Sequence, residues 1–96
     1  MRVQTITNAL QSQLTLTKDT KILEIGTGFP VTLKYLKDTF GCRVHAIEPS
    51  AEARDIIAQD KGIKLIGRYA EELANLSETD EKFDAIIFSH ALENTN

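Results

Sequence analysis

The sequence predicts an α/β protein in which parallel strands alternate with helices. Two observations indicate this fold class: short apolar runs bounded by turn residues, and stretches of helical periodicity between those runs. A third is a Gly-Thr-Gly turn between the first apolar run and the helix that follows it. Continuously apolar strands are typical of parallel sheets, and strand–helix alternation produces layers joined by right-handed crossovers.

The amino-terminal stretch predicts an amphipathic helix over residues 2–14. Its apolar residues recur at helical spacing and are expected to face the core: Val3, Ile6, Ala9, Leu10 and Leu14. A polar connector over residues 15–20 separates this helix from the first strand, predicted over residues 21–25.

The turn after the first strand has the features of a ligand-binding corner. Gly26 can adopt backbone angles that are closed to other residues, and Gly28 lets a ligand approach the main chain closely. Pro30 suits the first position of the next helix, where its missing N–H has no partner to lose. We therefore expect the turn to present free amides at the carboxyl end of the strand, where open α/β sheets bind ligands.

The rest of the chain repeats the alternation. Gly41 is expected to end the helix over residues 30–40, and Ser50 to cap the next one. The fourth strand is almost wholly apolar, so we expect both of its faces to be covered. The predicted elements after residue 40 are a strand over 42–48, a helix over 51–59, a strand over 63–66, helical turns over 70–76 and a strand over 83–88.

Composition restricts the function. The 96 residues form one small domain at most, and a net charge of −3 from 11 basic and 14 acidic residues gives no electrostatic case for nucleic acid. No apolar run is long enough to span a membrane. Cys42 is the single cysteine, which favours a reducing, cytoplasmic setting, and no His/Cys spacing suits a zinc site.

Two acidic residues restrict the ligand. The dinucleotide fingerprint places a third glycine where this chain has Val31, and a carboxylate at Glu24 repels a pyrophosphate, so a nicotinamide-dependent enzyme is disfavoured. Glu24 instead favours a ligand with positive charge or with hydroxyl and amine donors. Glu48 lies 22 positions after Gly26 at the end of the second strand, where nucleotide-binding sheets place a carboxylate on the ribose hydroxyls.

Four segments in order resemble the class I S-adenosylmethionine-dependent methyltransferases, in particular small-molecule enzymes of the type 11 and type 12 kind. Glu24-Ile25-Gly26-Thr27-Gly28 is similar to motif I of that family, with Pro30 in place of its last glycine. Residues 45–50 resemble the family's second strand. Residues 67–73 resemble Gly-Asp-Ala-Glu-x-Leu, with Tyr69 at the acid. Residues 83–94 resemble Phe-Asp-x-apolar followed by His-x-Leu-Glu-His, with Asn94 replacing the final His.

The resemblance implies a Rossmann-like three-layer sandwich with strand order 3-2-1-4 and S-adenosylmethionine as cofactor. By that resemblance, Glu24 and the turn amides meet the methionine end and Glu48 the ribose. The adenine lies near Pro49 and Ala70, and Ser89 and His90 border the methyl group. His90 is a candidate general base, with support of its loop as the alternative role. The implied cofactor-binding residues are Glu24, Gly26, Thr27, Gly28, Glu48, Pro49, Ala70 and Ser89.

The family fold continues past its fourth strand with a helix, a Pro-Gly-Gly-like turn and a fifth strand. Residues 1–96 are therefore expected to form a single methyltransferase-like cofactor-binding domain that is incomplete at its carboxyl terminus. Its fourth strand would be an apolar sheet edge through which two copies could form a homodimer. The expected function is methyl transfer to a small-molecule acceptor. The alternative is a catalytically inactive Rossmann-like module that binds a nucleoside or a protein.

Overall fold

The computed structural model describes residues 2–67 and 82–89, which form three helices and four strands. The predicted alternation is confirmed within these ranges, and the helical turns expected over residues 70–76 lie outside them. The elements in chain order are α1 (Arg2–Gln11), β1 (Lys21–Ile25), α2 (Val31–Phe40), β2 (Arg43–Ile47), α3 (Ala51–Ala58), β3 (Ile63–Gly67) and β4 (Ala85–Phe88).

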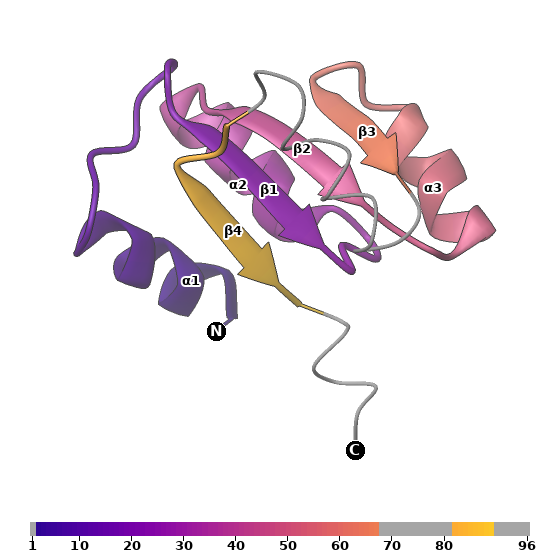
Figure 1. Ribbon diagram of the computed structural model, residues 1–96, viewed down its shortest axis with the longest axis horizontal. Coiled ribbons are helices and arrows are strands. Elements are labelled where there is room, and N and C mark those ends of the chain that lie inside the picture. The colour runs from indigo at the N-terminus through magenta and orange to yellow at the C-terminus, as the bar shows by residue number, and fades with distance from the viewer. Residues whose placement is uncertain (1, 68–81, 90–96) are drawn as a thin grey trace.

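The four strands form one parallel sheet in the order β3-β2-β1-β4, which confirms the predicted topology (Figure 1). Ile25, the last residue of β1, lies opposite Ile47 of β2 and Phe88 of β4. The three strands therefore end at the same edge. The chain leaves β1 toward β2 and β3 and then returns to the other side of β1 for β4. This change of direction is the topological switch point, the position at which open α/β sheets bind ligands.

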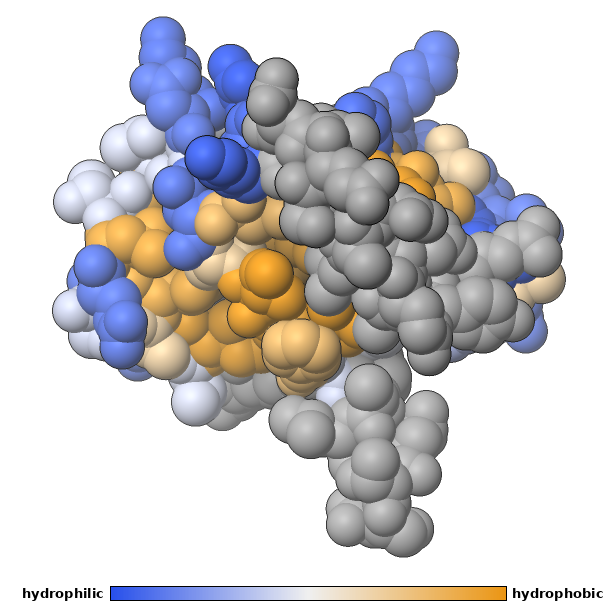
Figure 2. Space-filling model, viewed as in Figure 1, coloured by the Kyte–Doolittle hydropathy of each residue, from blue (hydrophilic) through white to orange (hydrophobic). Residues whose placement is uncertain are grey.

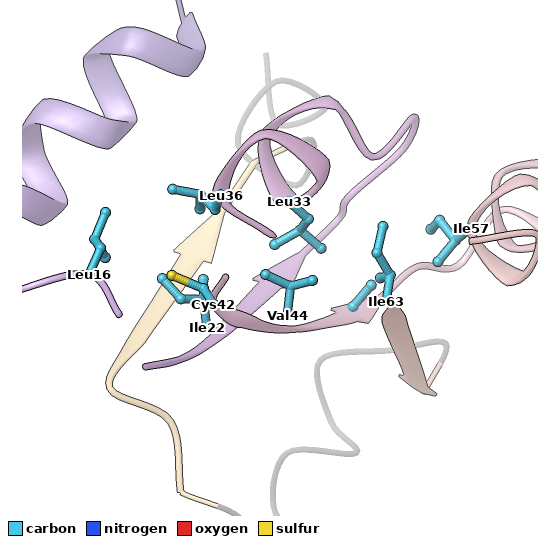
Figure 3. Packing of buried hydrophobic residues seen from close by; sticks show 9 residues of the cluster. Leu16, Ile22, Leu33, Leu36, Cys42, Val44, Ile57 and Ile63 are labelled. Atoms are coloured by element: carbon cyan, nitrogen blue, oxygen red, sulfur yellow. The ribbon is translucent and has the colours of Figure 1, made fainter. Parts of the chain in front are cut away.

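The main core lies between one face of the sheet and the helices (Figure 3). Ile22 and Val44 point from the sheet toward Leu33 and Leu36 of α2, and these four side chains are at most 2% exposed. Ile57 of α3 joins the same cluster, and Leu10 of α1 packs against it. A smaller cluster on the opposite face holds Leu23, Ile25 and Ile47, with Ile66 and Phe83 packed against it. Leu33 and Leu36 of α2 and Ile57 of α3 are therefore the residues that attach these helices to the sheet.

The ends of α2 and α3 follow from their capping residues. Gly41 adopts a left-handed conformation at φ 76° and its N–H donates to the Lys37 carbonyl, as predicted. The Ser50 hydroxyl accepts from the Ala53 N–H at 3.3 Å, also as predicted. Pro30 differs from the prediction: it precedes the first helical residue, because its ψ of 54° lies outside the helical region.

Helix α1 ends at Gln11, three residues earlier than predicted, and one assignment of its faces was wrong. Thr7 is its buried residue, at 1% exposure, whereas Ala9 is exposed. Burial is tolerated because the Thr7 hydroxyl donates to the Val3 carbonyl at 2.7 Å within the same helix. Apolar periodicity alone does not detect a buried threonine whose hydroxyl is hydrogen-bonded to a carbonyl of its own helix.

Strand β4 is not covered on both faces, contrary to the prediction. Its side chains alternate: Ala85 and Ile87 pack against the main core, whereas Ile86 and Phe88 on the opposite face are 45% and 51% exposed. Figure 2 shows the apolar surface on this side of the sheet. At its amino end the strand is tied to β1 by Asp84, whose Oδ2 accepts from the Lys21 N–H at 2.8 Å. Asp84 is therefore structural and lies at the edge away from the switch point.

The state of Cys42 and the length of the helices bear on the predicted cytoplasmic location. Cys42 is a buried free thiol, and its burial raises its pKa. It therefore packs as a small apolar residue of the main core. Within residues 2–67 and 82–89, no helix is long and apolar enough to cross a membrane. The cytoplasmic location stays a prediction.

Replacing Leu36 by Ala tests the core between α2 and the sheet. The Leu36 side chain is fully buried, so we expect a loss of about 2–5 kcal/mol in the free energy of unfolding. The matched control is Val31→Ala on the same helix, which should cost less than about 0.5 kcal/mol because Val31 is 62% exposed. Urea denaturation followed by circular dichroism measures both. Equal losses would contradict the assignment of the two faces.

The predicted homodimer through β4 can be tested by light scattering. Strand β4 is the terminal strand in the sheet order and carries no charged residue, so nothing in its own sequence opposes pairing with another strand. We expect the mass of two chains at high concentration and the mass of one chain for Ile86→Lys, which places a charge on this strand. A single-chain mass at all concentrations would contradict the dimer.

Candidate functional site

The carboxyl ends of β1 and β4 meet at the switch point through Glu24 and Ser89. The Ser89 hydroxyl donates to Oε2 of Glu24, and the Ser89 N–H donates to the Ile25 carbonyl at 3.0 Å. Both side chains are buried, at 3% and 2% exposure. A buried carboxylate is costly unless polar groups solvate it, so the hydroxyl of Ser89 offsets part of this cost. The result is a carboxyl group held in a fixed position at the edge of the sheet where β1 and β4 end.

A pocket of about 310 Å³ opens beside this pair. Its polar lining residues are buried and form a floor, whereas Phe29 and Val31 are exposed at its rim. Its volume falls at the lower end of the range for small-ligand pockets. The lining residues are Val3, Glu24, Thr27, Phe29, Val31, Thr32 and Ser89.

The glycine turn forms the wall between β1 and α2. Gly26 and Gly28 have φ angles of 74° and 60°, a left-handed conformation that a Cβ disfavours, so both positions require glycine. The Gly26 N–H donates to the Ile47 carbonyl at 2.9 Å, which attaches the turn to β2. The buried Thr27 hydroxyl donates to the Glu24 carbonyl at 3.0 Å and closes the turn on itself.

Glu48 joins this turn to the next corner of the chain. Its Oε1 accepts from the Gly28 N–H at 2.6 Å and its Oε2 from the Ser50 N–H at 2.8 Å, and the residue is 4% exposed. Nη1 of Arg54 donates to the Glu48 and Pro49 carbonyls at 3.1 and 2.6 Å. The carboxylate thus holds two connections that are 20 residues apart in the sequence, β1–α2 and β2–α3, in one fixed arrangement.

A family model described as a methyltransferase domain matches residues 23–96. This span covers most of the chain and includes the glycine turn, Glu48 and Ser89. The chain belongs to the methyltransferase-domain family. The recognition of a class I methyltransferase from the sequence motifs is thereby confirmed, and methyl transfer is the general chemistry of this family. None of the curated proteins matches the chain significantly.

The geometry of this methyltransferase domain corrects one expectation about its turn. The amides of Gly26 and Gly28 are not free, because the Ile47 carbonyl and the Glu48 carboxylate already accept from them. These two main-chain donors of the turn are therefore used within the protein. Gly26 is buried, and neither glycine is among the residues that line the pocket.

The structure brings the two predicted acids to the same turn but from different sides. Glu24 lines the pocket with Thr27 and Ser89, whereas Glu48 is not among the residues that line it. Pro49 is exposed at the corner after β2.

Other predicted residues lie outside the described ranges, and some pocket residues were not predicted. Ala70 and His90 belong to the first group. Sequence reasoning missed Val3, Val31 and Thr32 as pocket residues, because helical periodicity indicates a buried face and not which residues border a cavity. It also missed Phe29, which lies in the turn before α2.

Replacing Glu48 by Gln tests the clamp on the turn. An amide has one acceptor oxygen, so one of the two backbone N–H groups loses its partner. We expect a loss of about 1–3 kcal/mol in stability and faster hydrogen exchange at the Gly28 amide. Glu52→Gln, at an exposed position in the first turn of α3, is the control. If exchange at Gly28 is the same in both variants, Glu48 does not hold the turn.

Proposed function

We propose that this methyltransferase domain binds S-adenosylmethionine beside the glycine turn and takes part in methyl transfer to a small-molecule acceptor. The observation that carries the proposal is the placement of the turn between two buried carboxylates, Glu24 on the β4 side and Glu48 on the β2 side. Membership of the methyltransferase-domain family supports it.

The residues present suit this cofactor better than a dinucleotide. Ionised carboxylates only accept hydrogen bonds, and each oxygen has two lone pairs, so Glu48 can accept from ribose hydroxyls in addition to its two backbone donors. Glu24 attracts the positive charge that the cofactor carries and repels a pyrophosphate. Helix α2 has no side-chain cap, so the positive end of its dipole suits the carboxylate of the methionine part.

S-adenosylmethionine supplies a methyl group on a positively charged sulfur, which an O, N or C nucleophile of the acceptor can displace. The protein's contribution to such a reaction is alignment and exclusion of water. Phe29 and Val31 supply apolar surface at the pocket rim. Ser89 is held by its bonds to Glu24 and Ile25, which supports a role for this residue at the border of the methyl group. Roles for Pro49 and Ala70 at the adenine, and for His90 as general base, are part of the proposal.

A second function has one specific observation in its favour. Both oxygens of Glu48 already accept backbone N–H groups, which a purely structural carboxylate would also do. The alternative is therefore a catalytically inactive module that binds a nucleoside or a protein. Binding measurements separate the two functions.

Calorimetry with S-adenosylhomocysteine tests the proposal. We expect micromolar binding to the unaltered chain, and Glu48→Ala should weaken it by about 1–3 kcal/mol because the ribose hydroxyls lose their acceptor. Glu52→Ala is the control, and circular dichroism verifies that each variant is folded. Absence of binding to the unaltered chain would contradict the cofactor assignment.

A change in the ligand distinguishes a direct contact between Glu48 and the ribose from a purely structural role of Glu48 in the turn. If Glu48 accepts from the ribose, the 2′-deoxy analogue of S-adenosylhomocysteine should bind the unaltered chain about tenfold more weakly than the parent. Equal affinities would show that Glu48 supports the turn without contacting the sugar.

A further inference from the structure

A second and larger hollow lies between the start of α2 and the end of α3. Its volume is about 500 Å³, within the usual range for small-molecule sites. Phe29, Val31 and Ile56 supply its apolar lining, and Lys34, Asp60 and Lys61 its charged lining. We call this hollow the α2–α3 groove. This groove is separate from the pocket beside Glu24 and Ser89, although Phe29 and Val31 line both.

The apolar lining of the α2–α3 groove is unusually exposed. Phe29 and Val31 are each 62% exposed, more than the other large apolar side chains of the described residues. Val31 lies outside the core because Leu33 and Leu36 already fill the face of α2 that meets the sheet, and Phe29 lies in the turn before the helix. Large apolar side chains gathered in a concave surface are typical of binding sites and not of ordinary solvent-exposed surface.

The charge of the groove is positive because its acidic residue is already engaged. Oδ1 of Asp60 accepts from the Gly62 N–H at 2.9 Å and lies 3.6 Å from Nζ of Lys37. Lys37 also contacts Asp38 at 2.9 Å, and this contact raises the pKa of Lys37. Lys34 and Lys61 are exposed and form no ion pair with residues 2–67 or 82–89. Two lysines without acidic partners thus border an apolar surface.

We propose that the α2–α3 groove binds a small anionic amphiphile, a molecule with an apolar body and a single carboxylate or comparable anionic group. The apolar body packs on Phe29, Val31 and Ile56, and the anionic group lies between Lys34 and Lys61. The volume favours a small molecule over a helix of a partner protein. The occupant contacts Phe29, next to Gly28, and so borders the turn of the candidate site.

Binding of decanoate, measured by calorimetry and by amide chemical shifts of the full chain, tests the proposal. We expect saturable binding with shifts centred on residues 29–34 and 56–61, and weaker binding of decylammonium, which has the same tail and the opposite charge. Lys34→Gln and Lys61→Gln should each weaken decanoate binding by about three- to tenfold through loss of one charged partner. Phe29→Ser should weaken both ligands, because the apolar surface is shared.

Two control variants lie elsewhere on the protein. Lys18→Gln removes an exposed lysine outside the groove, and Phe88→Ser removes an exposed phenylalanine from the opposite face of the sheet. Both should leave decanoate binding unchanged. Equal binding of decanoate and decylammonium would overturn the charged part of the proposal. Absence of binding, or shifts centred on β4, would overturn the site. Neither result depends on whether the chain binds S-adenosylhomocysteine.

Discussion

The site depends on one interaction, the hydrogen bond from the Gly28 N–H to the buried carboxylate of Glu48. Ordering two glycines in left-handed conformations within one short turn is entropically costly, because glycine loses more backbone entropy on ordering than other residues do. An acceptor from a neighbouring strand connection offsets this cost. Arg54 and Ser50 hold the same corner, so the turn is fixed by β2 and α3 as much as by its own sequence.

The same carboxylate can serve two purposes. Glu48 completes the hydrogen bonding of the turn, yet its oxygens keep lone pairs that a hydroxyl can use. The structural role is the observed one, because Glu48 accepts from two backbone N–H groups and is not among the residues that line the pocket. A contact between Glu48 and a ligand is part of the proposed function.

On the other side of the turn, residues distant in the sequence come together. Glu24 and Ser89 are 65 residues apart and meet because β1 and β4 are adjacent in the sheet. Their pairing fixes a carboxyl group at the switch point, while Phe29 and Val31 place apolar surface at the rim of the pocket. We propose that this combination favours a cationic, partly apolar ligand over a pyrophosphate, in line with membership of the methyltransferase-domain family.

The sequence by itself determined the fold class, the strand positions, the glycine turn and the family. These follow from local rules: apolar runs, helical spacing, and the need for glycine at left-handed positions such as Gly26 and Gly41. Only the tertiary structure decided which groups are hydrogen-bonded within the protein and which line a pocket. In the folded chain the Gly28 N–H donates to Glu48, and Phe29 and Val31 are exposed. Thr7 is buried on α1, whereas Ala9, which was expected to face the core, is exposed. The physical reason is that a hydrogen bond or a cavity depends on residues distant in the chain, whose relative placement no local pattern encodes.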